Sequence, residues 1–172
     1  QYGHIVSFDT GGITVADGSG KHTNSSGEDY VAWCFKANGG TTSSNTDGTI
    51  TSTVQANQDA GFSIVTYTGT GSTGTYGHGL SSSPDWIMTK RTDAVEGWLV
   101  WSSSLSTSNY IYLNGSGAAG TDTNAYKTIG ATTNQIGTDV TVNTSGGTYI
   151  SYCFHNVDGF SKSGSYVGNG SN

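Results

Sequence analysis

Charged residues are scarce in this chain of 172 residues: Asp, Glu, Lys and Arg together make up 10% of it. Disordered chains are usually rich in charge and proline and poor in aromatic residues. This chain has one proline but ten tyrosines, four tryptophans and five phenylalanines. Its six basic residues are scattered and its net charge is −6, whereas nucleic-acid binding needs clustered Lys and Arg. We therefore expect an ordered protein with no nucleic-acid partner.

Residues that favour helices are also few, with one methionine and two glutamates. No apolar run approaches the length needed to cross a membrane, so we expect no membrane insertion. The abundant residues are instead 24 Ser, 26 Thr, 27 Gly and 12 Asn. Thr, Tyr, Val, Ile and Trp favour strands, and Gly, Asn and Asp favour turns. This composition predicts an all-β protein, and it is typical of extracellular or virion-surface β proteins.

Alternation of apolar and polar residues marks the expected strands. Several of them have apolar side chains on both faces, which predicts central strands covered on both sides; residues 30–35 and 98–101 are the clearest examples. Between the strands lie Gly-rich turn clusters, so we expect an antiparallel β-sandwich of the jelly-roll or concanavalin-like kind. The expected strands are His4–Phe8, Gly12–Ala16, Asp29–Phe35, Thr49–Val54, Phe62–Thr68, Asp85–Arg91, Glu96–Ser102, Asn109–Asn114, Asp139–Asn143, Thr148–Phe154 and Ser163–Val167.

Part of the sequence occurs twice. Residues 24–35 resemble residues 143–154 almost position for position, and residues 61–72 resemble residues 159–171. Such repetition indicates a β unit used more than once, cut out of phase by the ends of the chain. We expect closing strands of a first repeat in residues 1–37, a linker or hairpin insertion in 38–59, a complete sandwich in 60–158, and the opening strand of a further repeat in 159–172.

The two cysteines, Cys34 and Cys153, occupy the same position in the two copies. A disulfide would have to join equivalent points of two repeats, although an extracellular location would permit one. Free cysteine is often fully buried. We therefore expect two separate, reduced and buried thiols, with the disulfide as the alternative.

Signals for catalysis or metal binding are weak. The only glutamates are Glu28 and Glu96, and Glu28 is replaced by Gly147 in the second copy. No Gly-x-Ser-x-Gly nucleophile motif is present. Residues 45–48 faintly resemble a calcium loop but lack the closing glutamate of an EF-hand. We therefore expect no enzyme, no metal site and no cofactor.

Two groups of residues are candidates for binding. The first could contact a ligand such as a sugar: His78 lies in a glycine-rich loop, Trp86 begins a strand after Pro84, and Tyr110 and Tyr112 share a strand face that could border solvent. The alternative for each residue is an ordinary role in the core or in a loop. The second group lies in the strands near the chain ends, which we expect to act as assembly edges because unpaired strands drive association: Tyr2, Ile5, Tyr166 and Val167.

Five segments together resemble a known family. They are Asp29–Lys36, Gly61–Gly71, His78–Leu80, Pro84–Arg91 and Tyr149–Phe154, followed by the Gly-Phe-Ser opening at Gly159. This pattern resembles a repeated β domain in large structural proteins of tailed bacteriophages, particularly phages of marine bacteria. The resemblance covers most of the chain, although members with this pattern are much longer. It implies a component of a virion tail fibre or appendage, and it implies no catalytic residues.

The leading functional hypothesis is therefore a bacteriophage virion structural protein that forms a tail fibre or surface appendage and contacts the host. Its expected partners are copies of itself, other virion proteins and a host-surface glycan, and its expected location is the virion, outside the cell. One alternative is a carbohydrate-binding module of a virion or secreted protein. Another is a subunit of an extracellular filament that assembles by strand addition.

Overall fold

The computed structural model of the chain describes residues 3–18 and 23–170 and divides it into two compact units, residues 1–35 and 36–172. The first unit contains an antiparallel hairpin of β1 (His4–Asp9) and β2 (Gly12–Ala16). Asp9 accepts hydrogen bonds from the hydroxyls of Ser7 and Thr14, which lowers its pKa. Both strands match the sequence prediction.

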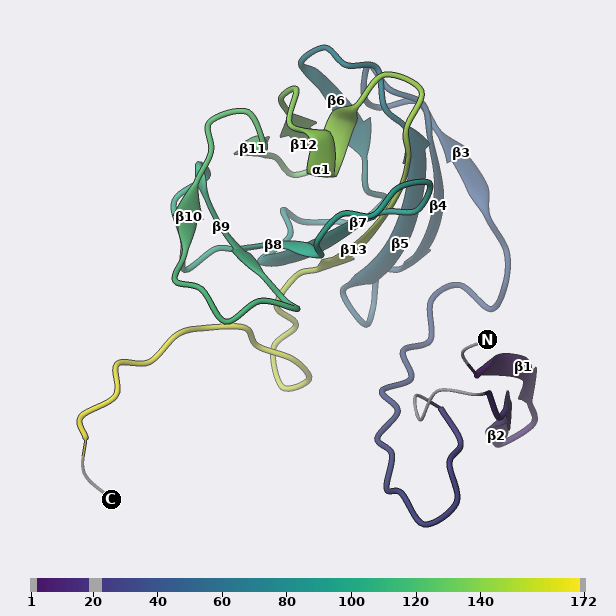
Figure 1. Cartoon of the computed structure of the whole chain (residues 1–172). Coiled ribbons are helices and arrows are strands. Elements are labelled where there is room, and N and C mark those ends of the chain that lie inside the picture. The colour runs from purple at the N-terminus through teal and green to yellow at the C-terminus, as the bar shows by residue number, and fades with distance from the viewer. Residues whose placement is uncertain (1–2, 19–22, 171–172) are drawn as a thin grey trace. The chain divides into compact units, whose positions relative to one another are not determined.

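The second unit is built on an antiparallel sheet of eight strands, seen in Figure 1 as the curved layer that runs from β10 to β3. The order across the sheet is β10-β9-β8-β7-β13-β5-β4-β3. In chain order the strands are β3 (Ser43–Asn45), β4 (Ser52–Asn57), β5 (Phe62–Thr68), β7 (Trp86–Arg91), β8 (Leu99–Ser102), β9 (Asn109–Tyr112), β10 (Gly120–Thr121) and β13 (Thr148–Phe154).

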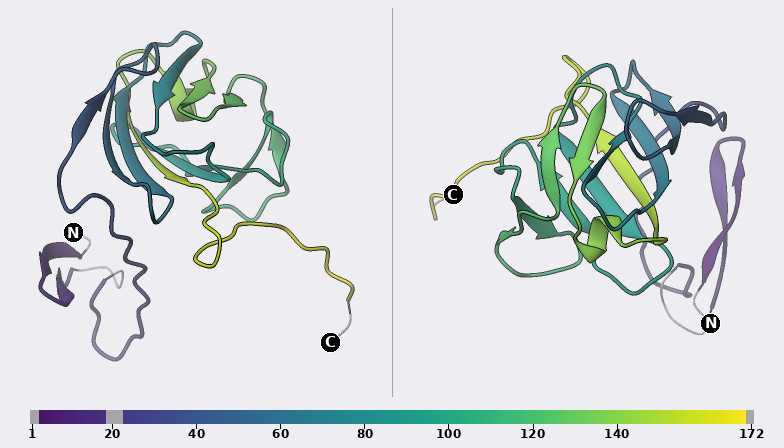
Figure 2. Two further views of the ribbon diagram at one scale, coloured as in Figure 1. Left: turned by 180° about the vertical axis from the view of Figure 1, so that it is seen from behind. Right: turned by 90° about the horizontal axis from the view of Figure 1, so that it is seen from above.

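A smaller layer covers one face of this large sheet. It consists of a three-stranded antiparallel sheet in the order β11-β12-β6 and a single helical turn, α1 (Figures 1 and 2). Its elements are β6 (Gly74–Gly77), β11 (Tyr126–Ile129), β12 (Thr133–Ile136) and α1 (Val140–Asn143). Residues of both layers form one hydrophobic cluster. The molecule is thus mostly β, with antiparallel sheets and little helix.

The core between the layers contains hydroxyl groups as well as hydrocarbon. Thr89 on the large sheet lies 2.6 Å from the hydroxyls of both Ser151 and Tyr126, measured between oxygens. Ser151 in turn accepts from the hydroxyl of Tyr76 at 3.3 Å, and Asn134 donates to the Tyr76 hydroxyl at 3.3 Å. All five side chains are buried. The network therefore joins two strands of the large sheet to all three strands of the small one.

Three stacked tyrosines fill the same core. The ring of Tyr67 lies 4.6 Å from that of Tyr76 and 5.2 Å from that of Tyr149, measured between centroids. The hydroxyl of Tyr67 donates to the carbonyl of Val142, and that of Tyr149 donates to the carbonyl of Val140, each at 2.8 Å. Because both acceptors lie in α1, two side chains of the large sheet hold the helical turn in place.

Three of the expected strands are not strands in the structure. Residues 29–37 and 162–169 have no strand assignment, although strands were expected at Asp29–Phe35 and Ser163–Val167. Residues Asp139–Asn143 form α1 and its cap instead of a strand, because the Asp139 carboxylate accepts from the backbone N–H of Thr141 and so starts a helical turn. Only Val142 of the two valines in this turn is buried.

The first copy of the repeat was also expected to be a covered strand, and this was wrong. Trp33 is 81% exposed and Cys34 is exposed. Cys153 is buried, as expected, and both thiols are free. Burial raises the pKa of the Cys153 thiol to about 12. The identical residue types at Cys34 and Cys153 therefore have opposite environments, because only β13 lies between two neighbouring strands.

The remaining differences concern weakly patterned segments. Residues 38–59 contain β3 and β4, which pair at one edge of the large sheet, and Ile50 and Val54 contribute to the core. No strand was expected at β3, β6, β10, β11 or β12. These strands are short and rich in Gly, Thr and Asn, so they lack a clear alternation of apolar residues.

The buried hydroxyl network leads to a stability prediction. Replacing Thr89 by Val keeps the shape of the side chain but leaves the hydroxyls of Tyr126 and Ser151 without their shared partner. We expect a loss of about 1–3 kcal/mol in the free energy of unfolding, the usual cost of an unsatisfied buried polar group. Denaturant titration measures it. The matched control is Thr66→Val, at an exposed position of β5 in the same sheet. An equal effect of both changes would contradict a role for the network.

Candidate functional site

The large sheet has a second face, turned away from the small layer, which we call the outer face. On β7 and β13, Ile87 and Cys153 point into the core, so the residues that alternate with them point outward. These outward side chains are mainly aromatic or apolar and are only half-buried: Trp86, Met88, Ile150, Tyr152 and Phe154. Aromatic residues thus cluster on a broad and partly open surface.

The rings on the outer face contact one another. Trp98, just before β8, stacks with Tyr152 at a centroid distance of 6.1 Å, and Phe62 of β5 lies 4.7 Å from Phe154. Trp86 is paired with Phe154 on one side and with Ser102 on the other. Exposed threonines on the same sheet, such as Thr66, place hydroxyls beside this surface. A surface of aromatic rings bordered by hydroxyls suits either a sugar ring or a protein partner.

Of the four residues proposed from the sequence as ligand contacts, only Trp86 lies on the outer face. His78 is fully buried; its Nε2 lies 3.2 Å from the carbonyl of Gly130, and its Nδ1 accepts from the N–H of Leu80. Burial lowers the pKa of His78. Both ring nitrogens therefore contact the protein itself, and the side chain is not accessible to a ligand in this structure.

The two tyrosines of β9 lie on the core side of the sheet, since Tyr112 is paired with Leu99. Tyr110 packs against the core, whereas Tyr112 is 41% exposed. Their rings meet edge to face with centroids 5.2 Å apart. Tyr112 thus borders solvent, whereas Tyr110 is only partly exposed. The structure does not bring this pair together with Trp86, because they lie on opposite faces.

The residues proposed as assembly edges are exposed wherever the structure describes them. Ile5 is paired with Val15 in the first unit and is half exposed. Tyr166 and Val167 are 94% and 95% exposed and belong to no strand. Tyr2 lies outside the described residues.

Sequence reasoning missed Tyr152 and Phe154 as surface residues. The signal was present, because residues 149–154 alternate between two apolar faces and only one of them can face the core. Within the described residues, no group of three or more His, Cys, Asp or Glu side chains is placed to hold a metal ion, and no helix is long and apolar enough to span a membrane.

Comparison with known proteins gives one match. A family model described as "Domain of unknown function (DUF7483)" matches residues 1–172. The chain belongs to the DUF7483 family. No curated protein and no solved structure matches it. Membership in DUF7483 therefore carries no activity or ligand over to this chain, and the function must be argued from its own residues.

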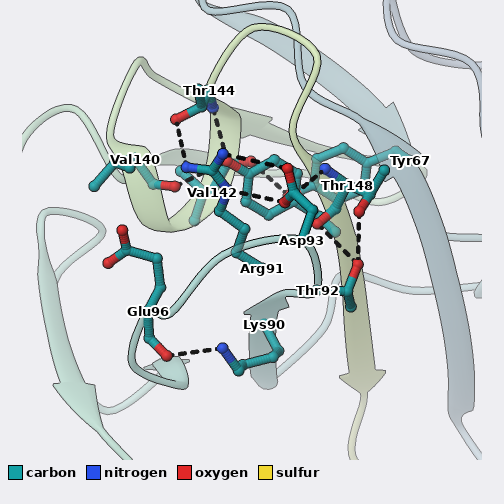
Figure 3. A network of polar contacts seen from close by, with 11 residues as sticks. Tyr67, Lys90, Arg91, Thr92, Asp93, Glu96, Val140, Val142, Thr144 and Thr148 are labelled. Carbon is teal, nitrogen blue, oxygen red and sulfur yellow. Dashed lines mark hydrogen bonds and ion pairs between the residues drawn. The ribbon is translucent and has the colours of Figure 1, made fainter.

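In this DUF7483 chain a network of polar contacts surrounds Arg91 and Asp93 (Figure 3). Arg91, at the end of β7, donates to both carboxylate oxygens of Asp93, at 2.9 and 3.3 Å, and to the hydroxyl of Thr144 at 3.3 Å. Asp93 also accepts from the N–H of Thr148 at 3.2 Å. The network thus ties the loop after β7 to the start of β13 and to the segment after α1. Its groups are engaged with each other, which indicates a structural role.

This network leads to a prediction about pH. The hydrogen bonds from Arg91 lower the pKa of Asp93 to about 2, below its usual value of about 4. A lowered pKa in the folded state means that the ionised carboxylate stabilises the fold above about pH 4 and that this contribution is lost as the pH falls toward 2. We expect Asp93→Asn to lower the melting temperature at neutral pH and to match the original protein near pH 2.

The control for this measurement is Asp59→Asn, which alters an exposed aspartate in the turn before β5. Thermal unfolding followed by circular dichroism between pH 2 and pH 7 compares the three proteins. A difference between Asp93→Asn and the original protein that stays constant over this range would contradict the assigned pKa.

Proposed function

We propose that this chain is a structural subunit of a bacteriophage virion that builds a tail fibre or similar surface appendage and contacts the host. The proposal rests on two segments, residues 29–35 and 160–167. They expose large apolar side chains and belong to no strand, while their sequence counterparts, β13 and β5, are neighbours in the middle of the large sheet. Exposed strand-like segments of this kind favour association between subunits.

The phage assignment rests on the sequence resemblance described above, and the two-layer β architecture supports it. The large sheet with its smaller covering sheet is the arrangement expected of a jelly-roll or concanavalin-like sandwich, which we propose as the fold. The core and polar-network contacts described above hold the sandwich together, so the chain's exposed ends and outer face remain as its surfaces for partners. We propose other copies of the chain and other virion proteins as these partners, and the outside of the cell as the location.

The proposal predicts concentration-dependent association. Sedimentation velocity and negative-stain microscopy of the chain should show oligomers that grow with concentration. Deleting Gly164–Asn172 should shift the population toward monomers while circular dichroism shows an unchanged fold. The double variant Tyr166→Ser, Val167→Ser keeps the chain length and should have a similar effect, because it removes two exposed apolar side chains. A chain that stays monomeric at all concentrations would overturn the assembly role.

The aromatic outer face favours a second candidate, a carbohydrate-binding module. Half-buried Trp86 and Tyr152 present ring surfaces on which a pyranose could stack. On a glycan array this candidate predicts saturable binding that Trp86→Ala reduces at least about tenfold, or about 1.4 kcal/mol. Thr68→Ala, at an exposed position of the same sheet, should leave it unchanged. An array without any saturable signal would remove the candidate and leave the assembly role intact.

A further inference from the structure

The strands of the large sheet carry no acidic side chains. All eight lack Asp and Glu, and their only charged residues are Lys90 and Arg91 at the end of β7. The chain as a whole has 12 acidic residues against 6 basic ones. Its carboxylates therefore all lie outside these strands, and the strands themselves carry positive charge alone.

The two cations have different partners. The guanidinium of Arg91 donates to both carboxylate oxygens of Asp93. The ammonium of Lys90 instead donates to the main-chain carbonyl of Glu96 at 2.8 Å, and the carboxylate of Glu96 points away from it (Figure 3). No carboxylate of the described residues forms an ion pair with Lys90. Because an ammonium has three N–H donors, the half-buried Lys90 can still bind an anion.

Lys90 lies on the outer face, next to aromatic rings. Thr89 is buried in the core, so Lys90 points outward. Lys90 is opposite Ile150 in the ladder with β13, and the ladder with β8, continued by one pair, places Trp98 on its other side. Trp98 stacks with Tyr152 at a centroid distance of 6.1 Å. A positive charge and two stacked rings therefore occupy neighbouring positions on one surface.

The backbone of Trp98 is held in place on both sides. Its N–H donates to the side chain of Asn114 at 3.1 Å, and its carbonyl accepts from the N–H of Leu113 at 3.1 Å. A ring that is already fixed loses little conformational freedom when a ligand binds. Trp86 lies on the same face of β7, four residues before Lys90, or roughly 13 Å along the strand. This surface is longer than a single sugar ring.

The position of this surface within the sheet favours a sugar over a peptide. β7, β8 and β13 each have a neighbouring strand on both sides, whereas an extended peptide that binds by strand addition needs an unpaired edge. A pyranose needs only a ring face for its C–H groups and polar groups for its oxygens. A surface without carboxylates, beside an ammonium that lacks an ion-pair partner, favours a sugar with a negative charge.

We infer that the outer face binds an oligosaccharide that contains a carboxylated sugar, such as a uronic or sialic acid. The carboxylate pairs with Lys90, and the sugar ring lies on Trp98 and Tyr152. This inference rests on the carbohydrate-binding candidate above and names its substrate class. Because the net charge of the chain is −6, polyanions are repelled at long range, so recognition depends on this local arrangement.

Paired ligands test the role of the charge without changing the sugar ring. The probes are tri-galacturonate and sialyllactose, each compared with its methyl ester, which has no negative charge. Isothermal titration calorimetry should show that the acid form of at least one probe binds about tenfold more tightly than its ester. Lys90→Gln should abolish this preference and leave the affinity for the ester unchanged, whereas Trp98→Ala should weaken the binding of both forms.

The matched control is Lys127→Gln on β11 of the small layer, which changes the net charge equally and should leave binding intact. Circular dichroism checks that each variant is folded. Equal binding of acid and ester, or a preference that Lys90→Gln retains, would overturn the inference and leave the carbohydrate candidate standing. So would neutral glycans that bind on the array when neither acid does.

An acidic peptide, hexaglutamate, tests the choice of ligand class. If it binds as tightly as the acidic sugars and Lys90→Gln weakens it equally, the sugar assignment is overturned. If no glycan of any kind binds saturably, both the inference and the carbohydrate candidate are overturned, while sedimentation still decides the assembly role.

Discussion

The contact between the two layers depends on hydroxyl groups. Thr89 and Ser151 on the large sheet meet Tyr76 and Tyr126 of the small sheet through a chain of hydrogen bonds between buried side chains. Only 33% of the chain is hydrophobic, so threonine, serine and tyrosine take core positions that leucine or isoleucine fill in other proteins. Such a core is stable only when nearly every buried hydroxyl has a partner, and this requirement fixes the small sheet on the large one.

Tyrosine hydroxyls also bond to backbone groups next to this contact. Tyr67 and Tyr149 hold α1 through its carbonyl groups, and the Tyr149 hydroxyl also accepts from the N–H of Thr144. Tyr30 makes the same contact with the N–H of Ser25 in the first unit. The turn that places β13 in the large sheet is therefore formed by local interactions, whereas the strand itself depends on neighbours. This separation explains how a segment can have the turn without the strand.

One face of the large sheet forms the core, so its outer face remains available to partners. Because the inner face of the large sheet is occupied by the hydroxyl network and the stacked tyrosines, most other aromatic residues of β7 and β13 are on the outer face. Large apolar side chains are also exposed in the segment after β13, at Phe160, Tyr166 and Val167. Exposed apolar surface of this extent is typical of a protein that associates with other molecules. It fits a subunit of a larger assembly.

Alternating residues in the sequence predicted β1, β2, β5, β7 and β13 closely, because each of these strands has a clear period of two. Alternation alone could not tell β13 from residues 29–35, since the two have nearly the same letters. Burial of a strand depends on the strands beside it, and β13 has β5 and β7 as neighbours in the large sheet. The helical turn α1 was predicted as a strand because its residues alternate. The side chain of Asp139 caps this segment and starts a helical turn instead. The sequence by itself thus determined the strand class and the turns, which depend on local residue preferences. Only the tertiary structure decided which face is buried, that His78 belongs to the interior, and which of the two similar segments, 29–35 or 148–154, becomes a strand. These outcomes depend on contacts between residues far apart in the chain.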